Sequence, residues 1–115
     1  MNAALACAQL EQLQVMLDSK RELAGLYSKF FEEKGISFRT ELPDTKVNYW
    51  LMCVELNDRL ERDLFLKETN ANGVMTRPIW QLMFRLPVFE KCQRDEQTNA
   101  QFLEERIVNI PSSVR

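Results

Sequence analysis

NAALACAQLEQLQVMLDSKRELAGLYSKFFEEK, residues 2–34, is the stretch from which the architecture of this chain follows. No proline interrupts it, and Gly35 directly after it is suited to a left-handed helix cap. The pattern therefore predicts one continuous helix from Asn2 to Lys34. Its apolar residues recur every three or four positions, which is typical of an amphipathic helix; they include Ala6, Leu10, Leu13, Leu17, Ala24, Tyr27 and Phe31.

The predicted helix is too long for a body of this size. At about 1.5 Å per residue it would extend roughly 50 Å, whereas a compact domain of this length has a radius of gyration of about 13 Å. We therefore expect its apolar stripe to be shared with polypeptide outside this chain, either a missing segment or a second subunit. The same exposed surface predicts self-association, such as a homodimer through the helix and the strand faces.

The composition excludes several classes of function. The 115 residues suit one domain, and 15 Lys and Arg against 17 Asp and Glu give a net charge of −2. The basic residues are scattered, whereas binding to nucleic acid favours a clustered basic face. No apolar run approaches the roughly 20 residues that cross a bilayer, and the amphipathic start is not a secretory signal. We expect a cytoplasmic protein without nucleic-acid or membrane partners.

The residues that commonly carry catalysis are sparse. There is no histidine, so His-based acid–base work and most zinc sites are excluded. Cys7, Cys53 and Cys92 are far apart and odd in number, which indicates reduced thiols with a buried, structural role and no metal site. Glu104 and Glu105 are adjacent on a predicted helix, so they point apart. No lysine lies in the apolar setting that would suit it to Schiff-base chemistry. We predict no catalytic or metal-binding residue in the chain.

The remaining pattern predicts an α+β fold. The long helix at 2–34 is followed by an α+β body at 36–115, in which a small, largely antiparallel sheet is covered by helices. Asp58 and Glu61 resemble a capping box at the start of the second helix, which should bury Leu60, Leu64 and Phe65. Phe102 should point inward from the last helix. The expected strands are 36–40, 47–56, 74–77 and 107–110, and the expected helices after the first are 58–71, a short turn at 88–92 and 96–106.

The segment Arg77-Pro78-Ile79-Trp80 is the candidate for ligand contact. It follows a strand end, its proline makes it stiff, and it combines a cation with a large aromatic ring. Such a loop can hold a sugar ring or a phosphate. The alternative is that Trp80 belongs to the core and that Arg77 is a solvated strand end.

Tyr49 and Trp50 form a second aromatic candidate, because adjacent rings can act as a stacking platform. They lie inside a predicted strand with apolar neighbours on both faces. We therefore expect both side chains to be packed in the core.

Five segments in order along the chain carry a further signal: Asn2–Leu13, Asn48–Leu51, Gly73–Trp80, Leu86–Phe89 and Asn109–Ser113. Together they resemble the C-terminal part of the DegT/StrS family of sugar aminotransferases. The likeness spans the whole chain, and the branch it is most similar to acts on legionaminic-type surface-sugar precursors.

The resemblance implies the small domain of a fold-type I enzyme that uses pyridoxal phosphate (PLP) to aminate a nucleotide-linked sugar for cell-surface polysaccharide or cell-wall biosynthesis. The family's PLP lysine, and an Asn-Tyr-Arg segment that reaches the partner subunit's cofactor, would precede this chain, and Met1 would be an introduced or internal start. This chain alone would then bind no PLP and would be inactive. Arg77 and Trp80 match the family's loop that faces the sugar-nucleotide. Phe84 stands where a histidine is expected, so a polar substrate contact is not expected there.

Two other readings of the sequence are open. The chain could be a small non-enzymatic interaction protein that docks a partner through its long amphipathic helix. It could also be a carbohydrate-binding module built on Arg77 and Trp80. Both differ from the aminotransferase reading in needing no catalytic domain.

Overall fold

The computed structural model describes residues 2–114, so the expectation about Met1 lies outside the described residues. The chain divides into two compact units. One holds the chain up to Met52 and from Ser112 onward, and the other holds Cys53–Pro111. Among the described residues no helix is long and apolar enough to cross a membrane, and no group of side chains could hold a metal ion. The prediction of buried cysteines is wrong for Cys7 and Cys92, which are exposed, while Cys53 is half-buried.

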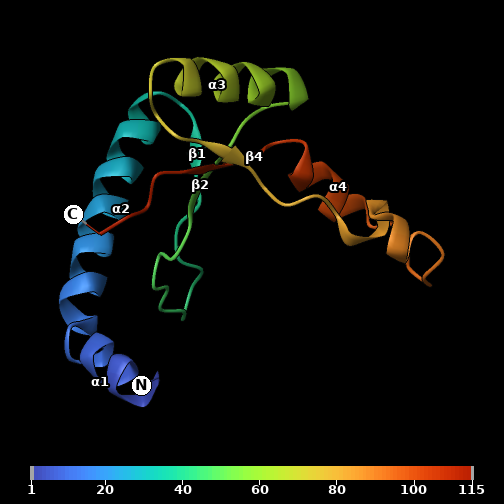
Figure 1. Cartoon of the computed structure of the whole chain (residues 1–115). Coiled ribbons are helices and arrows are strands. Elements are labelled where there is room, and N and C mark those ends of the chain that lie inside the picture. Colours follow the sequence, from blue (N-terminus) through green and yellow to red (C-terminus); the bar gives the residue numbers. More distant parts are fainter. Residues whose placement is uncertain (1, 115) are drawn as a thin grey trace. The chain divides into compact units, whose positions relative to one another are not determined.

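The first unit begins with two helices where the sequence predicts one. They are α1 (Asn2–Glu11) and α2 (Leu13–Glu33), separated at Gln12 (Figure 1). The Gln12 N–H bonds to the carbonyl of Gln9, three residues back, at 3.2 Å. The prediction of a continuous helix is therefore wrong at this point. Helix continuity depends largely on tertiary packing, and α1 has no buried residue that would align it with α2.

The C-terminal end of α2 is as the sequence predicts. Gly35 has a φ of +68°, and its N–H donates to the carbonyl of Glu32 at 3.0 Å. The N–H of Ile36 donates to the carbonyl of Phe31 at 2.9 Å. These two bonds form a Schellman motif, which glycine permits because it lacks a Cβ. The cap turns the chain into β1 (Ser37–Phe38), which packs against α2.

The core of the first unit is small. Leu23, Ala24 and Phe31 of α2 are buried. The ring of Phe31 stacks on that of Phe38 with centroids 6.2 Å apart. Other apolar side chains of this stripe remain exposed, which agrees with an expected cover from outside the chain. The exposed ones are Leu5, Leu10, Leu13, Val15, Leu26 and Phe30.

The strongest predicted strand is shorter than expected. Only Met52–Glu55 forms a strand, β2, while Tyr49 has a φ of +49° that is incompatible with extended backbone. The prediction that Trp50 is packed in the core is wrong, because its side chain is 69% exposed. The Asn48 side chain causes part of this difference, since its Oδ1 accepts the Trp50 N–H at 3.0 Å and favours a turn.

The structure confirms the α+β class and the small antiparallel sheet. The strand order is β1-β2-β4-β3, and β4 (Ile107–Ile110) lies where the sequence predicts a strand. The third strand, β3 (Arg77–Pro78), pairs antiparallel with β4 in the register Arg77 with Asn109. The core of the second unit consists of strand residues and one residue next to a strand: Val54, Leu56, Ile107, Val108 and Ile110.

Helix α3 (Arg59–Ala71) begins as predicted. Asp58 Oδ1 accepts the Glu61 N–H at 2.9 Å, and Glu61 Oε2 accepts the N–H of Asn57 at 2.8 Å. The second bond reaches one residue further back than in a standard capping box. The helix ends at Gly73 in a second Schellman motif, with a φ of +77°.

The prediction that Leu60 and Leu64 form the buried face of α3 is wrong. Leu60 is 76% exposed, Leu64 is also exposed, and Phe65 is half-buried. Leu66 is also half-buried, and polar side chains of the same helix make contacts within the unit. Arg62 Nη1 donates to the carbonyl of Glu104 at 2.7 Å, and the hydroxyl of Thr69 lies 2.6 Å from that of Thr76.

The last part of the second unit is less regular than predicted. Two short 3₁₀ helices, η1 (Met83–Arg85) and η2 (Pro87–Phe89), precede α4 (Thr98–Glu104). Phe102 of α4 is exposed, contrary to prediction, and the guanidinium of Arg106 lies 3.8 Å from its ring centroid. This cation–π contact shields the ring without burying it.

Candidate substrate-binding site

Strand β3 and the loop that follows it present two of the side chains that the sequence selects, Arg77 in the strand and Trp80 in the loop. Trp80 is 70% exposed, so the alternative that it belongs to the core is wrong. Arg77 is exposed, and its Nη2 lies 3.4 Å from the sulfur of Met75. Its backbone is fixed by the pairing with Asn109 in β4. Both side chains are therefore accessible to a ligand.

A buried carboxylate holds the chain just beyond Trp80. Glu104, at the end of α4, is only 8% exposed. Its Oε1 accepts the backbone N–H of Leu82 at 3.0 Å, and its Oε2 lies 3.1 Å from Nη2 of Arg85. Among the described residues Oε2 has no hydrogen bond of good geometry, so this ion pair supplies its counter-charge. Buried charges require such partners.

The sequence gives no signal for this role of Glu104. As one of two adjacent glutamates on a helix, it is indistinguishable from a solvated residue. Its neighbour Glu105 is more exposed and lies 3.9 Å from the guanidinium of Arg106. The difference comes from contacts with the segment 82–85, which local sequence does not encode.

A pocket of about 330 Å³ lies beside the same loop. Pro78 and Ile79 line it, while Arg77 and Trp80 are not among its lining residues. The loop thus turns one set of side chains into the pocket and the other set outward. The pocket is not a ready anion site, because each of its arginines pairs with a carboxylate, Arg59 and Arg62 with Asp63 and Arg85 with Glu104. Its other lining residues are Arg59, Arg62, Gln81, Arg85, Glu104 and Glu105.

Phe84 is engaged with cations. The guanidinium of Arg94 lies 4.6 Å from its ring centroid and that of Arg85 lies 5.7 Å away. These distances are within the range of cation–π contacts. The ring thus organises neighbouring arginines and offers no polar group to a substrate.

The model of the DegT/DnrJ/EryC1/StrS aminotransferase family matches residues 1–115. The chain belongs to this family. Among its curated relatives is GDP-perosamine synthase of Escherichia coli O157:H7, which is 29% identical over 111 residues, covering 96% of this chain and 30% of the relative. GDP-perosamine synthase of Vibrio cholerae is 26% identical over 113 residues, which cover 96% of this chain and 31% of that relative. The chain therefore spans about 30% of the length of these curated relatives.

Solved structures of aminotransferases share the fold. The aminotransferase TlmJ from Streptoalloteichus hindustanus superposes with a TM-score of 0.86 at 19% identity, covering 96% of this chain and 30% of that one. The PLP-form of Spr1654 from Streptococcus pneumoniae superposes with a TM-score of 0.82 at 18% identity, and the match covers 97% of this chain and 30% of Spr1654. These similarities show that the α+β fold of this chain also occurs in solved aminotransferases.

Among the described residues, no lysine is placed to bind PLP covalently in a pocket. A lysine would have to lie in a pocket with room for the ring and the phosphate. No lysine lines the pocket beside the Trp80 loop or the pocket of about 320 Å³ at Phe84. The Nζ of Lys20 is already bonded within the chain, since it donates to the carbonyls of Tyr49 and Ser112. No chemical step is therefore assigned to a cofactor on this chain.

Proposed function

We propose that this chain is the C-terminal domain of a PLP-dependent aminotransferase that acts on a nucleotide-linked sugar. In that enzyme it forms one wall of the substrate cleft, where Arg77 and Trp80 contact the sugar-nucleotide. The observation that carries the proposal is the exposure of Arg77 in β3 and of Trp80 in the loop after it, which the buried Glu104 carboxylate fixes at Leu82. A cation and an aromatic ring on a fixed backbone are suited to a phosphate and a sugar ring.

The catalytic apparatus of this enzyme lies in a further domain. The chain spans about 30% of its curated relatives, and no lysine lines the two pockets described above, which supports this division. The chain alone is then inactive and binds no PLP. The enzyme is a homodimer, and the exposed apolar residues of α1 and α2 are covered by the further domain or by the second subunit.

The sugar-nucleotide is a precursor of a cell-surface polysaccharide. Relatives named GDP-perosamine synthase favour a GDP-linked sugar. The resemblance of Asn48–Leu51 and Gly73–Trp80 to the legionaminic branch makes a legionaminic-type precursor the second candidate. The cytoplasm, where nucleotide sugars are made, is the proposed location.

Calorimetric titration of the 115-residue chain with GDP-linked and UDP-linked sugars tests this proposal. We expect weak binding of one of them, and about tenfold weaker binding for Trp80→Ala and Arg77→Ala, because each removes one contact. Lys67→Ala is the matched control, since Lys67 is an exposed cation on α3. Absence of binding at millimolar ligand would contradict the role of this loop.

Mixing the chain with PLP tests the proposal that catalysis resides in a further domain. We expect no imine absorbance and no transamination. A stable imine at a single lysine, together with turnover, would overturn the assignment of catalysis to a further domain. Reading the gene upstream of Met1 gives the complementary test, because an in-frame lysine motif and Asn-Tyr-Arg are expected there.

The alternative of a small non-enzymatic interaction protein is not favoured. The family match covers the full length of the chain, including the region that would dock a partner. A separate carbohydrate-binding module is disfavoured for the same reason.

A further inference from the structure

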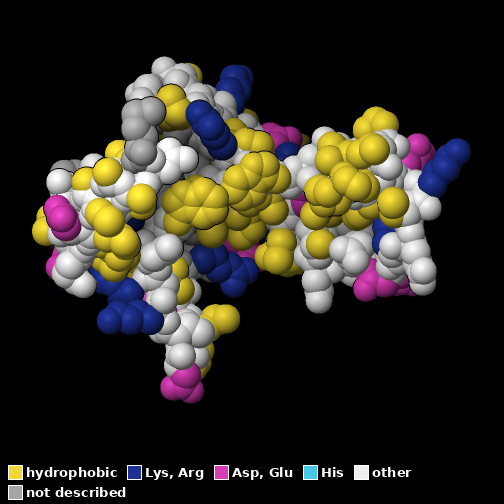
Figure 2. All heavy atoms as spheres, turned by 60° about the horizontal axis from the view of Figure 1, so that its bottom comes forward, with side chains coloured by type: hydrophobic (Ala, Val, Ile, Leu, Met, Phe, Trp, Pro, Cys, Tyr) yellow, Lys and Arg dark blue, Asp and Glu magenta, His cyan; other side chains and the backbone are white. Residues whose placement is uncertain are grey.

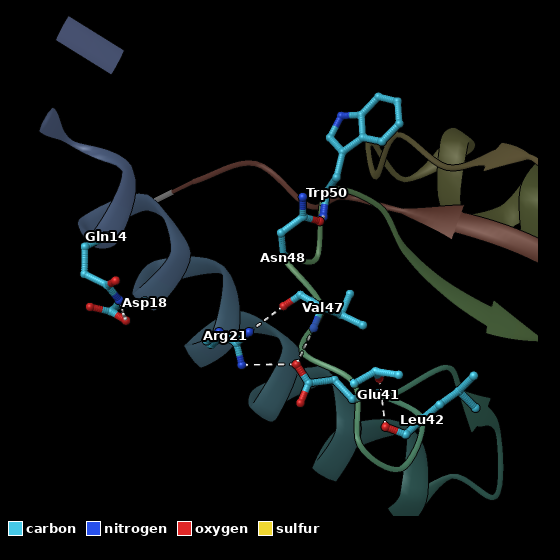
Figure 3. A network of polar contacts seen from close by, with 9 residues as sticks. Gln14, Asp18, Arg21, Glu41, Leu42, Val47, Asn48 and Trp50 are labelled. Carbon is cyan, nitrogen blue, oxygen red and sulfur yellow. Dashed lines mark hydrogen bonds and ion pairs between the residues drawn. The ribbon is translucent and has the colours of Figure 1, made fainter. Parts of the chain in front are cut away.

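Most arginines of the second unit have a carboxylate partner. The paired ones are Arg59, Arg62, Arg85 and Arg106. Arg21 of the first unit is paired as well, and Figure 3 shows its Nη1 donating to Glu41 Oε1, at 3.1 Å. Among the described residues no carboxylate pairs with Arg77 or Arg94 in this way. Because Arg77 already belongs to the candidate site, Arg94 is left as a cation without an assigned role.

Arg94 is held in place by groups that do not neutralise its charge. Its guanidinium lies 4.6 Å from the centroid of the Phe84 ring, and its Nη1 donates to the carbonyl of Glu90 at 3.1 Å. The carboxylate of the next residue, Asp95, is bonded to Gln97 instead, since its Oδ1 accepts the Gln97 N–H at 3.0 Å. Within residues 2–114 the other N–H groups of Arg94 are therefore available. A planar guanidinium binds phosphate through paired hydrogen bonds.

Arg94 lines a pocket whose walls are largely apolar. This is the pocket of about 320 Å³ at Phe84, called the Phe84 pocket below, and it lies wholly within the second unit. Leu82, Met83 and Phe89 supply its apolar side chains. Small-molecule sites have volumes of about 300–1,000 Å³, mostly apolar walls and a few fixed polar groups. The Phe84 pocket thus has room for one ring system and places a cation beside it.

The backbone around the pocket is fixed by its own hydrogen bonds. The N–H of Arg85 donates to the carbonyl of Leu82 at 2.9 Å, and the N–H of Cys92 donates to the carbonyl of Phe89 at 3.0 Å. The N–H of Leu82 is bonded to the buried carboxylate of Glu104 at 3.0 Å. A pocket whose walls are already ordered costs a ligand little when it binds.

We propose that the Phe84 pocket binds the nucleoside phosphate part of the nucleotide-linked substrate. The base packs against Met83 and Phe89, and a phosphate pairs with the guanidinium of Arg94. This inference rests on the proposed function, because it places the other end of the same substrate. Leu82, which lines the pocket, follows Trp80 by two residues, and two residues span at most about 7 Å. One molecule can therefore contact both Trp80 and the pocket.

Gln97 favours a base over an apolar segment of polypeptide as the occupant. It lines the Phe84 pocket, and its Nε2 donates to Asp95 Oδ1. Its Oε1 is left as an acceptor, which suits the N–H groups on the edge of a base. The aromatic wall suits the ring, because every base has a π-face that packs on aromatic side chains. A segment of the further domain that carries a carboxylate is the competing occupant, and the test must separate the two.

Two methionines make the test local. Met83 lines the Phe84 pocket, whereas the sulfur of Met75 lies 3.4 Å from Nη2 of Arg77. Methyl-labelled methionine gives one NMR signal for each residue, and Met83→Leu and Met75→Leu assign the two signals. The chain is titrated with GDP, with pyrophosphate and with a GDP-linked sugar. We expect GDP and the GDP-linked sugar to shift the Met83 signal strongly, and pyrophosphate to shift it weakly, because it has no ring.

Substitution of Arg94 tests the phosphate contact. Arg94→Ala should weaken binding of GDP about tenfold, and Arg94→Lys should fall in between, because lysine keeps the charge but not the paired hydrogen bonds. Lys91→Ala is the matched control, since Lys91 is an exposed cation three residues away and does not line the pocket. It should leave binding of GDP unchanged. Equal losses in Arg94→Ala and Lys91→Ala would show a general effect of charge and overturn the contact.

The outcomes separate this inference from the proposed function. If Arg77→Ala and Trp80→Ala weaken binding of the GDP-linked sugar but Arg94→Ala does not, the pocket is not the nucleotide site, while the proposed function stands. If Arg94→Ala alone weakens it, the pocket is supported and the role of Arg77 and Trp80 fails. If pyrophosphate shifts the Met83 signal as strongly as GDP does, the contact with the base is overturned. If no ligand shifts that signal at millimolar concentration, the inference fails, and a segment of the further domain is the better occupant.

Discussion

The carboxylate of Glu104 accepts the backbone N–H of Leu82 at 3.0 Å, and this bond joins the end of α4 to the chain beyond Trp80. We predict that Glu104→Ala lowers the free energy of unfolding by about 2 kcal/mol, because it leaves this donor and the Arg85 guanidinium without their partner. Glu104→Gln should cost less, since its oxygen still accepts from Leu82. Urea denaturation measures both, and Glu105→Ala, expected within about 0.5 kcal/mol of wild type, is the control.

Two glycines should respond to alanine with opposite signs. Gly35→Ala should destabilise the chain by about 1 kcal/mol, because its φ of +68° brings a Cβ into conflict with the backbone. Gly25→Ala should stabilise it by about 0.5–1 kcal/mol, because Gly25 lies inside α2 with nothing within 4 Å of an added Cβ. Thermal unfolding followed by circular dichroism compares them. Unchanged stability of Gly35→Ala would argue against the cap, and a loss in Gly25→Ala would contradict the second expectation.

The buried hydroxyl of Thr76 connects α3 to the chain that follows it. Its Oγ1 lies 2.6 Å from that of Thr69 and 3.0 Å from Nδ2 of Asn70. Thr76→Val keeps the shape and removes these bonds, so we expect a cost of about 1–2 kcal/mol. Thr40→Val, at an exposed position, should change the free energy of unfolding by less than about 0.5 kcal/mol. Equal effects at the two positions would contradict the role of this cluster.

The exposed apolar residues at the start of the chain should drive self-association. Figure 2 shows apolar side chains reaching the surface in patches, with Lys and Arg scattered among them. The double variant Leu10→Glu, Leu13→Glu should shift the chain towards monomer, because both side chains are exposed in the helical stripe. Light scattering across a range of concentrations measures the shift, with Lys29→Glu as the charge control. A wild-type monomer at high concentration would contradict the expectation.

Local sequence rules predicted the helix ends well. Gly35, Gly73 and Asp58 have the φ angles or side-chain bonds expected of caps, because a cap depends on residues within one turn. The strand at Ile107–Ile110 and the α+β class followed from periodicity. Arg77 and Trp80 of the candidate segment are both exposed, and their role in binding stays a prediction.

The features that sequence missed depend on distant partners. Trp50 reads as a core residue in a strand, but Ser112, 62 residues away, bonds its carbonyl and helps to keep it in a turn. Leu60 and Leu64 were predicted to be buried but are exposed, whereas Arg62 of the same helix donates to the carbonyl of Glu104, 42 residues away. Apolar spacing alone does not reveal which face of a helix will find hydrogen-bond partners.

The break at Gln12 has a consequence for measurements of assembly. It leaves α1 with ten residues and no buried side chain, and helices shorter than about 12–15 residues are marginal in water without tertiary contacts. The amide hydrogens of α1 should therefore exchange with solvent far faster than those of α2, where Leu23, Ala24 and Phe31 are buried. When another polypeptide covers α1, its exchange should slow. Hydrogen–deuterium exchange at this one helix is thus a built-in reporter of docking.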